Sequence, residues 1–174
     1  MAIAMSRHGG AAVLHRYNSI TEQARMKSYA RDASKEDNPI AGAAIGTTGD
    51  YIERAAALIA TGVTFLCVDV AHGHHILMRE ALSALRVAFG DDIHIMAGNV
   101  ATLEGVNDLA DWGADSVRCN IGGGSICSTR IQTGHGMPGL QTVVECAKTD
   151  RNVKIIADGG IRNSGDIVKA LGAG

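Results

Sequence analysis

The sequence predicts an α/β fold in which strand–helix units repeat around a parallel sheet. Short apolar runs alternate with longer amphipathic stretches along almost all of the 174 residues, the pattern typical of repeated βα units. Polar side chains directly follow several of these runs, at the end of a parallel sheet where ligands bind. Hydrophobic residues make up 46% of the chain, which is enough for a sizeable core in one domain.

Each predicted strand is an apolar run between polar or glycine-containing segments. In chain order the runs cover residues 11–15, 40–45, 65–69, 93–97, 116–120 and 153–157. Three helices are predicted between them from apolar residues that share one face. They are residues 50–60 with Ile52, Ala55, Ala56 and Ile59, residues 103–112 with Val106, Leu109 and Ala110, and residues 164–171, which end before Gly172.

Charge and cysteine usage exclude several classes of protein. The formal net charge is −2, from 16 Lys and Arg against 18 Asp and Glu, so no broad basic surface is available for nucleic acid or an anionic membrane. The four cysteines stand far apart without CxxC spacing, which favours neither a zinc site nor a disulfide framework. With no signal peptide and no membrane-spanning apolar run, we expect a soluble cytoplasmic protein.

Polar residues at the strand ends predict a ligand site. Asp69, His72, Asn99, Asn120 and Asp158 each follow or close a predicted strand. A single aspartate there is often only a helix cap, but the carboxyl ends of parallel strands converge, so the repetition favours a shared site. Asp158 precedes two glycines and a helix that starts near residue 164; a carboxylate beside exposed backbone N–H groups would suit a ribose hydroxyl and a phosphate.

The glycine-rich segment 122–130 holds the most reactive candidate. Cys127 follows three glycines, Ser125 and Ile126, and it is followed by Ser128, Thr129 and Arg130. Bare backbone can approach a phosphate or a cation closely, and the nearby positive charge would favour the nucleophilic thiolate. The alternative is that the cysteine simply packs as a small hydrophobic residue.

Several long segments resemble the IMP dehydrogenase and GMP reductase family, in family order. The Cys127 loop looks like its catalytic loop, and the resemblance extends over residues 1–10 with His15, 68–74, 97–102, 156–162 and 164–171. It implies a (β/α)₈ TIM barrel, usually a homotetramer, that acts in purine biosynthesis at C2 of a purine mononucleotide. The dehydrogenase oxidises IMP with NAD, and the reductase converts GMP to IMP with NADPH.

The resemblance also implies roles for individual residues. Cys127 matches the nucleophile and Thr129 a threonine that assists proton transfer. Residues matching the nucleotide site are Ser125, Asp158, Gly159 and Gly160; those matching the dinucleotide side are Asp69, Val70, Ala71, Asn99, Asn120, Ile121 and Gly122; and a potassium ion would be held by the carbonyls of Gly122, Gly124 and Cys127.

Two positions depart from the family pattern. Gly123 stands where proline or serine is common, and Asn120 where glycine is usual. We therefore expect a loop that is more mobile on one side and bulkier on the other. The sequence alone does not decide whether this loop binds potassium.

The segment between His15 and Ile40 has room for one helix and a polar linker around residues 34–39, without the regulatory CBS pair that many dehydrogenases insert there. The first and last barrel strands of the family have no counterpart in this chain. Residues 1–174 are therefore expected to be a partial catalytic barrel with unpaired edges near Val13 and Ile155. IMP dehydrogenase is favoured, GMP reductase is the alternative, and a non-catalytic nucleotide-binding or assembly fragment is the alternative of another class.

Histidines and the tryptophan need separate interpretations. His72, His74 and His75 follow a strand and could be mistaken for a metal cluster, but no carboxylate or cysteine stands at ligand spacing. His135 is expected in a flexible loop beyond the nucleophile, and Trp112 in the core.

Overall fold

The computed structural model describes residues 1–34 and 39–174, which form one parallel sheet of six strands. All six predicted runs form strands, and the strands lie in the sheet in chain order. They are β1 (Ala12–Leu14), β2 (Ala41–Ile45), β3 (Phe65–Asp69), β4 (His94–Val100), β5 (Ser116–Cys119) and β6 (Lys154–Ala157). Parallel neighbours need a crossover between them, and helices supply it.

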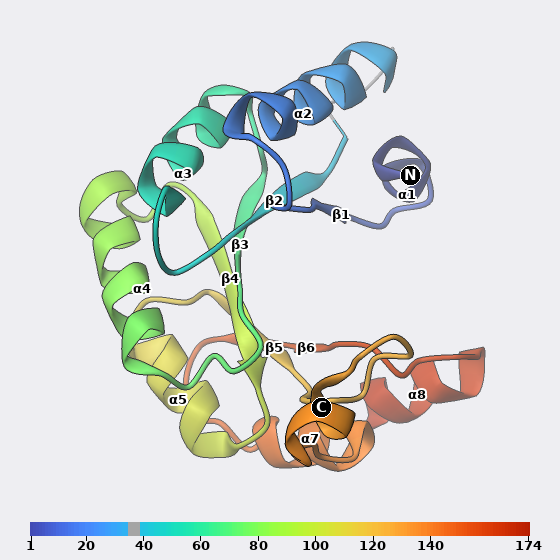
Figure 1. Ribbon diagram of the computed structural model, residues 1–174. Helices are drawn as coiled ribbons and strands as arrows, with labels where there is room; N and C mark the ends of the chain where they lie inside the picture. Colours follow the sequence, from blue (N-terminus) through green and yellow to red (C-terminus); the bar gives the residue numbers. More distant parts are fainter. Residues whose placement is uncertain (35–38) are drawn as a thin grey trace.

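Most of the helices lie along the outer, convex side of the curled sheet, so the fold is a half-barrel (Figure 1). In chain order they are α1 (Ala2–Arg7), α2 (Ile20–Ser34), α3 (Tyr51–Ala60), α4 (Ile76–Phe89), α5 (Leu103–Asp111), α6 (Thr129–Thr133), α7 (Gly139–Cys146) and α8 (Ser164–Gly172). The three predicted helices correspond to α3, α5 and α8. The helix expected between His15 and Ile40 is α2, and residues 35–38 of its predicted linker lie outside the described part of the chain.

The core lies between the sheet and the outer helices. Strands such as β2, whose five residues are all buried, are covered on both faces, as parallel strands usually are. Trp112 and Leu109 both belong to or pack against this core, as predicted. The predicted face of α3 is wrong in one respect: Ala56 is exposed, and the buried residues are Arg54, Ala55 and Leu58.

β1 and β6 are the outer strands of the sheet in the described residues. Val13 of β1 is 43% exposed, and α8, which follows β6, buries none of its residues. The prediction of open edges near Val13 and Ile155 is thus confirmed for this part of the chain. Within the same residues, no helix is long and apolar enough to cross a membrane.

A buried polar side chain on α2 joins the first two strands to α3. Gln23 Nε2 donates to the carbonyl oxygens of Leu14 at 3.1 Å and Ala44 at 2.9 Å. Its Oε1 accepts from Arg54 Nη1 at 2.8 Å, and Gln23 is fully buried. Since buried polar groups need partners, this side chain fixes α2 on the sheet next to the loop that follows β1.

We expect Gln23→Leu to lower the free energy of unfolding by roughly 2–3 kcal/mol, because two carbonyls and one guanidinium N–H lose their partner without access to water. Urea unfolding measures the change. The matched control is Gln141→Leu, at an exposed glutamine on α7, which should change stability by less than about 0.5 kcal/mol. Equal effects of the two substitutions would contradict this role for Gln23.

Candidate active site

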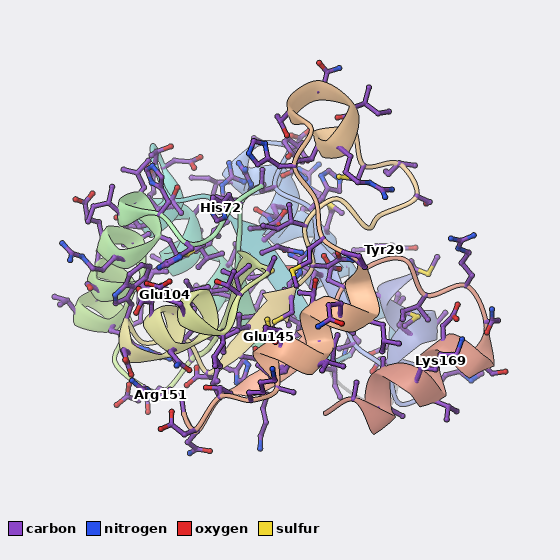
Figure 2. All side chains as sticks on the ribbon, turned by 90° about the horizontal axis from the view of Figure 1, so that it is seen from below. Tyr29, His72, Glu104, Glu145, Arg151 and Lys169 are labelled. Carbon is purple, nitrogen blue, oxygen red and sulfur yellow. The ribbon has the colours of Figure 1, made fainter. Side chains whose placement is uncertain are left out.

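The segment between β5 and α6 forms a tight loop in which the backbone folds back on itself. The N–H of Cys127 donates to the carbonyl of Gly124 at 3.1 Å. Gly122 has a φ of 82°, and a Cβ at that position would lie 2.7 Å from Arg130 Cγ. Both the conformation and the space therefore require glycine there. Figure 2 shows this loop and α6 projecting beyond the strand ends.

The thiol of Cys127 lies at the loop's partly exposed turn. Its Sγ is 3.3 Å from Thr129 Oγ1. Hydrogen bonds from the side chain and the backbone of Thr129 lower the pKa of Cys127 below its ordinary value and outweigh the opposing effect of burial. The charge of Arg130 and the backbone of Gly122 make smaller contributions that also lower this pKa. A larger fraction of this thiol is therefore thiolate at neutral pH.

Arg118 on β5 joins the ends of β3 and β6. Its Nη1 lies 2.7 Å from Asp69 Oδ1, and its Nη2 lies 2.9 Å from Asp158 Oδ2. The guanidinium also donates to Cys67 Sγ at 3.3 Å. Burial alone would lower the pKa of Arg118, but its neighbours raise it above the ordinary value, so the side chain stays charged.

Two asparagines extend this network to the loop. Asn99 Nδ2 donates to Asp158 Oδ2 at 2.6 Å and to the carbonyl of Asn120 at 2.9 Å. Asn120 Nδ2 in turn donates to the carbonyl of Asp158 at 2.6 Å. β4 ends three residues later than predicted, at Val100, so Asn99 lies inside the strand instead of after it. The ends of β4, β5 and β6 are consequently held together by side-chain hydrogen bonds.

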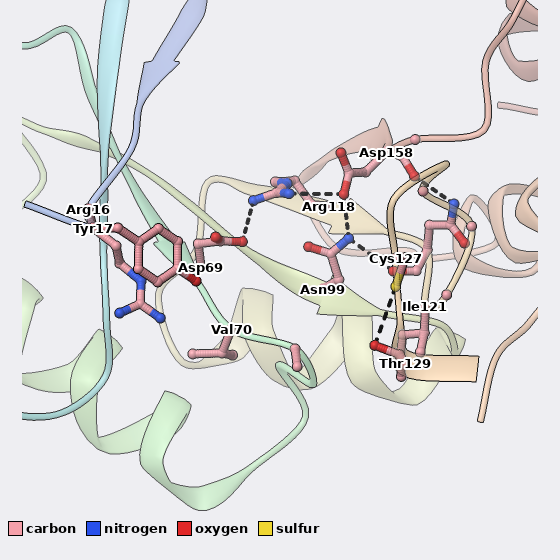
Figure 3. Close-up of a pocket in the computed structure, with 16 residues that line it drawn as sticks. Arg16, Tyr17, Asp69, Val70, Asn99, Arg118, Ile121, Cys127, Thr129 and Asp158 are labelled. Atoms are coloured by element: carbon pink, nitrogen blue, oxygen red, sulfur yellow. Dashed lines mark hydrogen bonds and ion pairs between the residues drawn. The ribbon is translucent and has the colours of Figure 1, made fainter. Parts of the chain in front are cut away.

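A cavity of about 350 Å³ opens between these groups and the loop. Most of the predicted site residues line it: Asp69, Val70, Ala71, Asn99, Asn120, Ile121, Gly122, Gly124, Cys127, Thr129, Asp158 and Gly159. Figure 3 shows the thiol of Cys127 and the carboxylate of Asp158 at one end of the cavity, with Asp69 further along. A thiolate that faces carboxylate and amide side chains across a cavity suits covalent chemistry on a polar, hydroxylated ligand.

Ser125 and Gly160 do not line this cavity. Gly160 instead lines a neighbouring cavity of about 270 Å³, together with Arg130, Arg162 and Lys169. Asp158 and Gly159 line both cavities. Ser125 is exposed on the loop and lines neither of them.

Sequence reasoning missed three residues of the cavity wall, Arg16, Tyr17 and Arg118. Arg118 could have been found, because it is a charged residue inside an otherwise apolar strand. Arg16 and Tyr17 follow β1, and their side chains contact each other, with the guanidinium carbon 5.2 Å from the ring centroid. They lie across the cavity from Cys127 (Figure 3).

The histidines that follow β3 have separate partners. His74 Nε2 lies 2.8 Å from Asp108 Oδ2, and the side chain of His75 accepts from the N–H of Leu77 at the start of α4. Burial and the neighbouring histidines lower the pKa of His72. Over residues 1–34 and 39–174, no three His, Cys, Asp or Glu side chains are grouped to hold a metal. His135 lies in the segment between α6 and α7, as expected.

Comparison with known proteins gives a match over the whole chain. A family model described as the IMP dehydrogenase / GMP reductase domain matches residues 1–174. The chain is 45% identical over 142 residues to an inosine-5'-monophosphate dehydrogenase of Nitrosopumilus maritimus, which covers 80% of this chain and 30% of that protein. The corresponding protein of Halalkalibacterium halodurans is 50% identical over 137 residues, 78% of this chain and 28% of that protein.

A protein named GMP reductase, from Leishmania major, is similar to the same degree. It is 47% identical over 138 residues, which are 78% of this chain and 28% of that protein. The chain thus spans less than a third of the length of these curated relatives.

We expect Thr129→Val to slow alkylation of Cys127 at neutral pH and to move the midpoint of its pH–rate profile upward. The valine keeps the shape but removes the hydroxyl that lowers the thiol pKa most, so less thiolate is present below that pKa. Iodoacetamide alkylation followed by mass spectrometry measures the rate at Cys127, because the other three cysteines are buried and shielded from the reagent. Thr133→Val, on the exposed part of the same helix, is the control, and a profile unchanged in Thr129→Val would refute the assignment.

We expect Arg118→Met to lower the free energy of unfolding by roughly 1–3 kcal/mol, because two partly buried carboxylates lose a charged hydrogen-bond donor. Urea unfolding at low and at high salt measures this. Arg79→Met, at an exposed position on α4, should be close to neutral. A loss no larger than that of Arg79→Met would show that Arg118 does not hold the strand ends together.

Proposed function

Since the chain belongs to the IMP dehydrogenase / GMP reductase family, we propose that its half-barrel carries the nucleophile and the nucleotide cavity of an enzyme that oxidises IMP to XMP. The observation that supports this most is the position of Cys127. Its thiol has a lowered pKa and faces the same cavity as Asp158. A thiol with a lowered pKa can act as the nucleophile, and a carboxylate in the same cavity can accept hydrogen bonds from ribose hydroxyls.

In the proposed reaction the Cys127 thiolate adds to C2 of the purine and forms an Sγ–C2 bond. The C2–H bond then breaks, and its electron pair leaves as hydride. The nicotinamide cofactor, when bound, supplies the hydride acceptor. Water then adds to C2, the Sγ–C2 bond breaks, and XMP is released with the thiol restored. Thr129, 3.3 Å from Sγ, is the group placed to share the thiol proton.

For the nucleotide we assign Asp158 to the ribose hydroxyls, and Ser125, Gly159 and Gly160 to the phosphate. Gly159 and Gly160 have φ values of 74° and 73°, a conformation that leaves bare backbone available to an anion. The cations Arg162 and Lys169 line the cavity that Gly160 shares. This charge supports a phosphate at that end of the site.

For the dinucleotide we assign Asp69, Val70, Ala71, Asn99, Asn120, Ile121 and Gly122, which all line the same cavity. The charges and amides there fit a hydroxylated, polar cofactor. Asp69 is half-buried, and its Oδ1 is paired with Arg118, which leaves its other oxygen for a cofactor hydroxyl. NAD is proposed for IMP oxidation, and NADPH for the alternative reaction, the reduction of GMP to IMP.

A potassium ion would be held by the carbonyls of Gly122, Gly124 and Cys127. The carbonyl of Gly124 already accepts from the N–H of Cys127, but a carbonyl oxygen has a second lone pair, so the loop still fits a monovalent cation. When bound, the ion would supply a positive charge at these carbonyls.

The wider architecture also belongs to this proposal. We propose that the six strands are part of a closed eight-stranded barrel, that residues 1–174 are catalytic barrel without a CBS pair, and that the enzyme is a homotetramer. The open edges at β1 and β6 support closure by further strands. Four free cysteines, one of which must stay reduced to react, support a reducing compartment such as the cytoplasm.

GMP reductase is the second candidate, because a relative of that name is 47% identical to this chain. The same Cys127 adduct would then lose ammonia from C2 and accept hydride. A non-catalytic nucleotide-binding fragment is the candidate of another class.

A paired assay on the protein that carries this chain decides between these functions. We expect NADH formation with IMP and NAD, little NADPH consumption with GMP, and a loss of kcat of roughly a thousandfold or more in Cys127→Ala. Turnover of GMP with NADPH, without turnover of IMP with NAD, would favour the reductase. Nucleotide binding without turnover of IMP or GMP would support the non-catalytic alternative. Full activity of Cys127→Ala would refute the proposed mechanism.

A further inference from the structure

The catalytic loop lies directly against the backbone that follows β6. A Cβ on Gly159 would lie 3.2 Å from Gly124 Cα, and a Cβ on Gly160 would lie 3.2 Å from the carbonyl oxygen of Gly123. These distances are tighter than most real Cβ contacts. The two backbone segments are therefore in close contact. An interaction that fixes one segment relative to the other also fixes the position of Cys127.

One side chain bridges the two segments. Asn120 is 5% exposed, and its Nδ2 donates to the carbonyl of Asp158 at 2.6 Å. The carbonyl can only accept, so the amide orientation follows from its partner. The other amide atom, Oδ1, is buried and has no hydrogen-bond partner among the described residues. An unpaired buried acceptor costs free energy, so fold stability alone does not explain an asparagine here.

The same side chain explains the glycine three residues later. A Cβ on Gly123 would lie 2.0 Å from Asn120 Nδ2, 2.6 Å from its Oδ1 and 2.7 Å from its Cγ. Gly123 is not among the glycines with positive φ, so alanine could adopt its backbone conformation. The space taken by Asn120, and not the backbone, is what requires glycine at this position.

We propose that Asn120 is a positioning residue for the nucleophile and that Gly123 is its steric counterpart. The amide of Asn120 fastens the loop to the backbone of Asp158, and the missing side chain at position 123 admits that amide. The two residues are then a sterically matched pair. This rests on the proposed function only in treating Cys127 as the nucleophile, because the contacts themselves involve no ligand.

The proposal predicts an effect on the reactivity of Cys127 that needs no turnover. Without the Asn120 hydrogen bond the loop is more mobile. The interactions that stabilise the thiolate, from Thr129, Arg130 and Gly122, are then formed for a smaller fraction of the time, so the pKa of Cys127 rises toward its ordinary value. In Asn120→Gly we expect the pH midpoint of iodoacetamide alkylation of Cys127 to rise and the rate at neutral pH to fall about threefold. Asn120→Asp, which keeps the shape but lacks the donor, should behave similarly.

A double-mutant cycle tests the pairing of the two positions. Gly123→Ala alone should raise the midpoint, because its Cβ displaces Asn120. In the Asn120→Gly background the same alanine should have no further effect. Gly172→Ala, where a Cβ would meet nothing within 4 Å, is the control for a glycine-to-alanine change and should leave the midpoint unchanged.

If Gly123→Ala folds too poorly for kinetics, recovery of its thermal midpoint by Asn120→Gly is the supporting result. An unchanged alkylation profile in Asn120→Gly, or equal effects of Gly123→Ala in both backgrounds, would overturn the proposal. Because the readout is thiol chemistry, an inactive protein would count against the proposed function and not against this pairing.

Discussion

The charge of Arg118 is the constraint on which the site depends. A largely buried guanidinium needs partners, and Asp69 and Asp158 supply them from the ends of β3 and β6. Because Asp158 is fixed in this way, it can also accept from Asn99 and offer its carbonyl to Asn120. One ion-paired group therefore sets the separation of three strand ends and, through the asparagines, the position of the loop that carries Cys127.

The glycines of the loop determine how closely it approaches the rest of the site. Gly122 must be glycine because of its positive φ and the nearby Arg130 stem, and Gly123 because Asn120 fills the adjacent space. The loop can consequently approach the backbone at Gly159 and Gly160 closely, which brings a thiol, a carboxylate and exposed backbone to one cavity. These groups lie at the carboxyl ends of the strands of the half-barrel, where active sites lie in parallel α/β folds.

The sequence predicted the strands well because parallel strands buried on both faces appear as continuous apolar runs. It also predicted which polar residues gather, since those runs all end at the same side of the sheet. It did not predict Arg118, whose meaning depends on two carboxylates 40 or more residues away. On α3 the predicted face is right except at Ala56, and the burial of Arg54 was not predicted, because its partners Gln23 and Asp50 are not revealed by helical periodicity. The requirement for glycine at position 123 depends on a contact that exists only in the folded loop.

The proposed function requires that Cys127 bond to C2 of a purine nucleotide during turnover. The most direct measurement is an acid quench of the protein that carries this chain, during reaction with purine-labelled IMP and NAD, followed by digestion and mass spectrometry. We expect the label on the peptide that contains Cys127 and none in Cys127→Ala. Formation of XMP without any label on Cys127, or with the label on another residue, would contradict it.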